Sequence, residues 1–251
     1  MKLIDAHTHC GNNKQTKYYD IEDVKQHLAE TEAKAYGAVI FAFPEDMYRI
    51  VDSQEDRIRA NEYVLEVSKA HENIYPFYFV WNDYIIPDNF NEYAGIKWHR
   101  HANEPRYDYD DPKCEAILKQ IRELNLPVTI EEVYEDTVHF IERNPRLPII
   151  IPHIGSLNGG YDRMVAFYDN PNVHFDTSVA PLTAIQEVLD NVGTERIIFG
   201  TDVSGTSQPF HNFPAVELAK VSQLDVDEAA MELILAGNIE RLIANTAYGT
   251  S

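Results

Sequence analysis

Short apolar runs alternate with longer amphipathic segments along this chain of 251 residues. The runs are rich in β-branched and aromatic residues, as buried strands are, and the segments between them carry apolar residues at helical spacing. Such alternation predicts βα units around a parallel sheet, and therefore an α/β fold. The predicted strands cover residues 2–6, 39–43, 74–81, 95–99, 126–131, 147–152, 173–176 and 196–200.

The segments between these strands are expected to be helical. Helices are predicted over residues 21–36, 53–71, 112–125, 134–143, 160–168, 182–192, 214–222 and 226–244, with a short one at 87–93. Gly37 is interpreted as the residue that ends the first helix. Eight strands with their helices favour a closed (β/α)8 TIM barrel, and the glycine-rich turn of a dinucleotide-binding fold is absent. No linker rich in Gly and Ser divides the chain, so we expect a single domain at residues 1–251.

Composition and charge narrow the partners. The chain has 44% hydrophobic and 25% charged residues, as soluble globular proteins do. No apolar run approaches the roughly 18 residues of a membrane span, and no secretory signal precedes the first strand. A formal net charge of -20 argues against a nucleic-acid partner, because it would repel a phosphate backbone. The two cysteines lie far apart in sequence, so we expect a cytoplasmic protein without disulfides.

The clearest chemical signal is the pair His7 and His9 at the end of the first strand. Side chains two residues apart in a strand point the same way, so both rings can reach one ion. Such a pair is a metal half-site, although short H-x-H runs also occur in solvated loops.

Other residues of the metal-binding or proton-transferring type stand at the ends of later strands. Because strand ends converge on one mouth of a barrel, where barrel enzymes place their chemistry, these side chains are expected to meet. They are Lys97 and His99, Glu131 and Glu132, His153, and Asp202. Strand alternation lets only one of Glu131 and Glu132 point into the mouth.

Seven short motifs carry a family resemblance across almost the whole chain. They are I-D-A-H-T-H at 4–9, G-I-K-W-H at 95–99, L-P-V-T-I-E at 126–131, I-P-H-I-G at 151–155, F-D-T-S at 175–178, F-G-T-D at 199–202 and G-N-I-E-R-L at 237–242. With these motifs in this order, the chain resembles the amidohydrolase superfamily of metal-dependent barrel hydrolases. The resemblance is to the group that includes proteins of the aminocarboxymuconate-semialdehyde decarboxylase type.

The resemblance implies roles for individual residues. It makes His7 and His9 metal ligands, and places Asp202 beside the metal and its water as ligand, general base or both. His153 is implied to be a second ligand or the group that polarises or protonates substrate. Asp176, on the seventh strand, is expected to support the site from behind.

Glu131 departs from the family pattern, which is L-P-V-x-x-H with a histidine at this position. We expect Glu131 to be a metal ligand, since a carboxylate oxygen can bind zinc and would favour harder ions such as Mn or Mg. It could instead orient a water as a base.

Lys97 stands where two-metal relatives carry a carbamylated lysine that bridges the metals. An unmodified ammonium that pairs with Glu131 or grips a substrate carboxylate is the simpler interpretation. The expected cofactor is therefore one divalent metal, with zinc ahead of Mn or Mg. Lys97, His99 and Arg100 are expected to bind substrate, and His101 and Arg106 lie on the same loop as Arg100.

These expectations describe a metal-dependent hydrolase of a small lactone, ester or amide, in which a cation-activated water attacks the carbonyl carbon and Asp202 takes the proton. The alternative is a non-oxidative metal-dependent decarboxylase on the same scaffold, and a non-catalytic barrel is the third reading. Loss of the usual histidine at Glu131 weakens the decarboxylase alternative. The resemblance also implies homo-oligomers formed through outer helices, although no helix has a distinctly apolar outer face.

Overall fold

The computed structural model describes residues 1–11, 19–42, 54–100, 106–205 and 213–248. Eight parallel strands follow one another around the sheet in chain order. They are β1 (Lys2–His9), β2 (Ala35–Phe41), β3 (Ile74–Val80), β4 (Gly95–His99), β5 (Val128–Glu131), β6 (Ile149–Ile151), β7 (Val173–Asp176) and β8 (Ile197–Ile198). Backbone bonds from Ala6 N to Phe199 O (2.9 Å) and from Asp202 N to His7 O (2.8 Å) join the first strand to the segment around the last. The predicted single (β/α)8 barrel is confirmed, while its extension over all of residues 1–251 stays a prediction.

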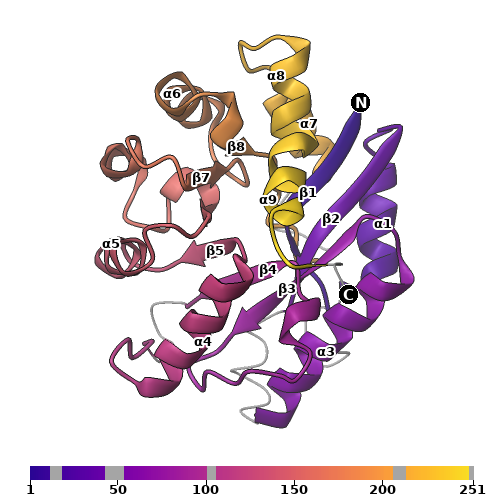
Figure 1. Cartoon of the computed structure of the whole chain (residues 1–251). Helices are drawn as coiled ribbons and strands as arrows, with labels where there is room; N and C mark the ends of the chain where they lie inside the picture. The colour runs from indigo at the N-terminus through magenta and orange to yellow at the C-terminus, as the bar shows by residue number, and fades with distance from the viewer. Residues whose placement is uncertain (12–18, 43–53, 101–105, 206–212, 249–251) are drawn as a thin grey trace.

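Helices surround the strands on the outside (Figure 1). The α-helices of the described chain are α1 (Ile21–Ala29), α3 (Gln54–Ala70), α4 (Pro112–Leu124), α5 (Tyr134–Arg143), α6 (Leu182–Val192), α7 (Pro214–Val221), α8 (Glu228–Glu232) and α9 (Asn238–Ala244). Shorter turns are η1 (Phe90–Glu92), η2 (Pro152–Gly155), η3 (Tyr161–Phe167), η4 (Thr194–Arg196) and the π-helical η5 (Leu233–Gly237). Within the described ranges, no helix has the length and apolar character needed to cross a membrane.

Strand alternation sorts side chains between the outer core and the barrel interior. On β4, Ile96 and Trp98 join the large apolar cluster between sheet and helices. Lys97 and His99 therefore face the other way, into the barrel, where both are buried. Period two thus turns the apolar outer face of the strand into support for a polar inner face.

A β-bulge interrupts this alternation on β1. Asp5 pairs with Ala38 and Thr8 with Ile40, so β1 advances three residues while β2 advances two. Ala6 contributes to the second apolar cluster, which lines the barrel together with Phe41, yet His7 also reaches the interior beside Phe41. A bulge re-aims side chains in this way, and here it lets His7 face inward directly after the inward-facing Ala6.

The expectation for Gly37 is wrong. The first helix ends at Ala29, and Gly37 lies within β2. A Cβ at Gly37 would stand 2.2 Å from the carbonyl oxygen of Asn73, which accepts the Ala38 N–H at 3.0 Å. Glycine is therefore needed for this close approach between the strand and the turn before β3.

Two other segments also differ from the predicted helices. Residues 160–168 form the 3-10 turn η3, and the predicted helix at 226–244 is divided by the π-helical turn η5. The carbonyl of Ile234 in η5 accepts the N–H of Phe199 at 2.9 Å. This bond ties the last helical segment to the strand end that carries Asp202.

Candidate metal centre and proton-transfer site

His7, His9 and Asp202 meet at the C-terminal ends of β1 and β8. Asp202 Oδ1 lies 3.1 Å from His9 Nε2 and 3.4 Å from His7 Nε2. The two rings are buried, whereas the Asp202 side chain is 31% exposed. The carboxylate therefore stands between the histidine pair and the open mouth.

A second group of donors shares His7 with the first. It comprises His7, Glu131 and His153, and within each group the donor atoms lie within 4.8 Å of one another. His153 Nε2 is 3.5 Å from Glu131 Oε2. Residues from β1, β5, the turn after β6 and the segment after β8 thus converge on one place, as expected for a barrel mouth.

The outward-facing nitrogens of the three histidines are already occupied. His7 Nδ1 lies 2.7 Å from Asp176 Oδ2, His9 Nδ1 is 3.3 Å from the Ala42 carbonyl oxygen, and His153 Nδ1 is 3.2 Å from the Ser178 carbonyl oxygen. Oxygens that can only accept fix the proton on Nδ1 and leave each Nε2 directed into the cluster. Metal-binding histidines have this arrangement, so the donor set fits a divalent cation.

Glu131 lies at the centre of the buried charges. Its carboxylate is 3.1 Å from Lys97 Nζ and 3.0 Å from His99 Nε2, and Lys97 Nζ is also 3.0 Å from His7 Nε2. Glu131 is 7% exposed, so its carboxylate is turned into the cluster and away from solvent. Lys97 is fully buried, and its ammonium lies 4.7 Å from the Phe41 ring centroid.

The environment separates the protonation states of the two inner histidines. Burial, followed by the charge of Lys97, lowers the pKa of His7 to about 4, so this ring is neutral at pH 7 as a metal ligand must be. Burial also lowers the pKa of His153, but the hydrogen bond and charge of Glu131 outweigh it and raise the pKa to about 9. His153 therefore carries a proton on Nε2 at neutral pH.

The carboxylates at the site stay ionised. Burial raises the pKa of Asp202, but the hydrogen bond from His9 and the charges of His7 and His153 hold it well below its usual range. Burial likewise raises the pKa of Glu131, while the charges of His99 and Lys97 lower it further. Two anions thus face two cations and a neutral histidine pair.

Replacing Glu131 with glutamine is expected to destabilise the fold by about 3–5 kcal/mol, because removing one partner leaves buried charges uncompensated. Thermal or urea unfolding measures the loss. Glu135→Gln is the matched control, since Glu135 pairs with Arg163 at the surface and its side chain is 75% exposed. Equal stability of the two variants would contradict the central position of Glu131.

Arg100 lies apart from the cluster. Its guanidinium pairs with Glu132 at 2.9 Å and approaches Asp136 at 3.7 Å. Glu132 accordingly points away from Glu131, as alternation requires, whereas Lys97 and His99 reach the cluster. A substrate role for Arg100 stays a prediction. Arg106 is bound to Asp136 at the surface, and His101 falls outside the described residues.

Backbone strain marks the site and was not visible in the sequence. His153, Ile154, Val179 and Asp202 all have positive φ, from 51° to 61°. Such a conformation is uncommon for any residue with a side chain and a genuine outlier for β-branched Ile and Val. The strand expected at 147–152 ends at Ile151, and His153 belongs to the strained turn η2 instead. Ser178, which contacts His153, also escaped prediction, although its motif F-D-T-S contains it.

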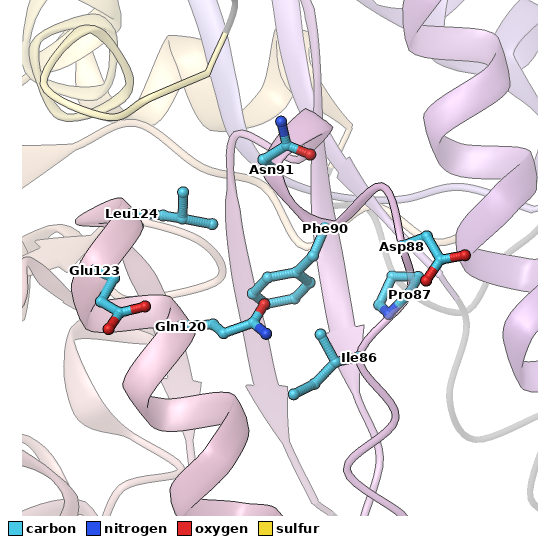
Figure 2. A pocket seen from close by; sticks show the side chains of 8 residues that line it. All are labelled: Ile86, Pro87, Asp88, Phe90, Asn91, Gln120, Glu123 and Leu124. Carbon is cyan, nitrogen blue, oxygen red and sulfur yellow. The ribbon is translucent and has the colours of Figure 1, made fainter.

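A groove on the flank of the barrel has no such chemistry. Figure 2 shows its lining, which includes Phe90, Gln120, Glu123 and Leu124, between η1 and the end of α4. The groove lies where the connection from β3 to β4 is short, and its lining residues contain no histidine or cysteine. The strand-end cluster is therefore the candidate site.

The fold and the cluster define a barrel enzyme with histidines and carboxylates at the strand ends. The amidohydrolase family profile matches residues 4–244, and the chain belongs to this family, within the amidohydrolase superfamily of enzymes. A search of curated proteins finds no match.

Solved structures share the fold at low sequence identity. A putative 2-pyrone-4,6-dicarboxylic acid hydrolase from Pseudomonas putida has a TM-score of 0.72 and 13% identity, covering 96% of this chain and 97% of its own. A 2,6-dihydroxybenzoate decarboxylase from Rhizobium has a TM-score of 0.67 and 16% identity, with 97% and 98% covered. A dihydroxybenzoic acid decarboxylase from Polaromonas with bound manganese has a TM-score of 0.68 and 12% identity, with 97% of both chains covered. Both hydrolases and decarboxylases therefore share this barrel.

Proposed function

We propose that the chain is a metal-dependent hydrolase of a small lactone, ester or amide. The observation that carries the proposal is the position of Asp202, whose carboxylate touches both His7 and His9 and is the part of the first donor group most open to the mouth. A base in this position can reach a water that approaches from solvent.

The ligands of one divalent cation would be His7, His9 and Asp202, with Glu131 as a further oxygen donor. When bound there, the cation would supply Lewis acidity toward a carbonyl oxygen and lower the pKa of a water. Mixed nitrogen and oxygen donors suit zinc, and the share of carboxylate oxygen also suits manganese, which is present in the Polaromonas relative.

The residues of the chain then divide the proton work. Asp202, held ionised by His9, accepts a proton from the attacking water. His153, kept protonated by Glu131, donates from Nε2 to the leaving oxygen or nitrogen. A base and an acid with pKa values pushed apart by their surroundings are the arrangement that hydrolysis requires. Lys97 and His99 balance Glu131 and border the position where a substrate would bind.

Decarboxylation is the alternative, in which His153 or Asp202 would protonate a ring carbon. Relatives with this activity share the barrel. The anionic Glu131, buried among the donors, would oppose a substrate carboxylate in the same place. The charge of the site therefore favours the hydrolase over the decarboxylase.

We expect about one divalent cation per chain, measured by elemental mass spectrometry on protein without a histidine tag. Hydrolysis of a panel of lactones, esters and amides should disappear on chelation and return with added zinc or manganese. 2,6-Dihydroxybenzoate joins the panel, with release of carbon dioxide as its readout.

The other outcomes separate the alternatives. Carbon dioxide release without hydrolysis would establish the decarboxylase and overturn the proposal. About two cations per chain would favour a carbamylated Lys97. Absence of bound metal on titration, together with absence of turnover, would leave a non-catalytic barrel.

A further inference from the structure

The turns that follow β6 and β7 meet behind the site. His153 and Ile154 occupy the first turn, and Val179 the second, and all three have positive φ. Strain of this kind costs on the order of 1–3 kcal/mol per residue and persists only where neighbouring groups over-determine the conformation. The contacts that hold both turns are therefore worth tracing.

Asp176 holds the two turns together. Its Oδ1 accepts the backbone N–H of His153 at 2.9 Å and that of Ser178 at 3.0 Å, and it also accepts the hydroxyl of Ser178. Its Oδ2 binds His7 Nδ1 at 2.7 Å. One buried carboxylate thus anchors a proposed metal ligand and both strained turns.

Ser178 contacts His153 through two atoms. His153 Nδ1 lies 2.9 Å from the hydroxyl oxygen and 3.2 Å from the carbonyl oxygen of Ser178. The hydroxyl proton goes to Asp176, which can only accept, so the hydroxyl oxygen is left as an acceptor. His153 Nδ1 must then be the donor, which directs Nε2 toward Glu131.

Contacts with α7 hold the Ser178 turn from the other side. The Lys220 ammonium donates to the carbonyl of Ala180 at 2.7 Å, and the N–H of Val179 bonds to the Glu217 carboxylate. Lys220 and Glu217 are themselves paired at 2.5 Å. The turn is therefore fixed on both flanks, and its hydroxyl can act as a rigid stop for the His153 ring.

We propose that Ser178 is a positioning residue, which fixes the orientation and the Nδ1–H form of the His153 ring and couples it through Asp176 to His7. This inference rests on the proposed function, because it explains how the acid of that function is held. Its geometry nevertheless concerns the protein alone, so it can be tested without turnover.

The test is Ser178→Ala, with Ser68→Ala as the matched control, since Ser68 is also a buried serine whose hydroxyl bonds to a carbonyl, here that of Leu65. In protein labelled with ¹⁵N at histidine, the unaltered chain should show a slowly exchanging His153 Nδ1–H, assigned with His153→Gln. Ser178→Ala should speed its exchange with water by about tenfold or more, because the hydroxyl acceptor is lost.

The catalytic readout is a change in kcat with little change in KM. Loss of such a supporting contact typically costs about 10- to 100-fold in activity, and we expect kcat of Ser178→Ala to fall by this factor per bound metal, on whichever lactone or ester proves best. Ser68→Ala should keep both kcat and the His153 signal.

Two results would overturn the inference. One is an unaltered protein in which His153 carries its proton only on Nε2. The other is a folded Ser178→Ala whose His153 signal and kcat match the unaltered protein. Absence of turnover in every protein would overturn the proposed function instead, and would leave the spectroscopic result to decide the role of Ser178.

Discussion

His7→Ala is expected to lose bound metal and hydrolysis together while the barrel stays folded. His7 is shared by both donor groups, and its Nδ1 is fixed by Asp176, so no other ring can take its place. Outer partners of a metal ligand are worth about 10- to 100-fold in metal affinity, and the ligand itself should be worth at least about 100-fold. Metal content per chain and competition with a chelator measure the loss.

The matched control for this variant is His71→Ala, which removes a histidine just after α3, outside the donor groups. It should keep the metal content and turnover of the unaltered protein. Circular dichroism and thermal unfolding check that both variants are folded. Unchanged metal content in a folded His7→Ala would remove the central claim about the site.

Much of the barrel was predictable because burial imposes period two on its strands. β4 and β7 have the predicted bounds, Gly95–His99 and Val173–Asp176. Once β4 is placed, alternation alone sends Lys97 and His99 inward. The same rule separates Glu131 from Glu132, and the structure places them as the rule requires.

The features that escaped prediction depend on contacts between distant segments. The β1 bulge follows from its pairing with β2, and Gly37 is explained only by the carbonyl of Asn73. Likewise, the turn that holds His153 is stable because Asp176, 23 residues later, caps it. Local sequence carries no signal for such long-range contacts, whereas the F-D-T-S motif did mark the segment that provides this one.

The departure at Glu131 also gains a physical meaning from its surroundings. In isolation it replaces a neutral ligand with an anion. In the structure it lies among Lys97, His99 and His153, so its charge offsets an interior that would otherwise be strongly positive. The substitution therefore alters the acid–base balance of the site as well as its ligand set, and it keeps His153 protonated.

Asp202→Asn is expected to lower kcat by about 100- to 10,000-fold, which is the range that a positioned general base contributes. Asparagine keeps the shape and one oxygen donor of the side chain but cannot accept a proton at neutral pH. It also tolerates positive φ, which Asp202 adopts at 61°, so the backbone should be undisturbed. Turnover is measured at saturating metal, which offsets the weaker binding by a neutral oxygen.

The control for Asp202→Asn is Asp190→Asn on α6, where the carboxylate meets only Gln186 at the surface at 2.8 Å. It should leave both turnover and metal content unchanged. If Asp202→Asn holds metal yet keeps more than about a tenth of the turnover, Asp202 is a ligand without the role of base. Glu131 would then be the remaining carboxylate near the proposed cation, and its contacts with Lys97 and His99 would have to loosen before it could accept a proton. If both metal and turnover are lost at every metal concentration, ligation is the main contribution of Asp202, and the retained Oδ1 is insufficient without the negative charge.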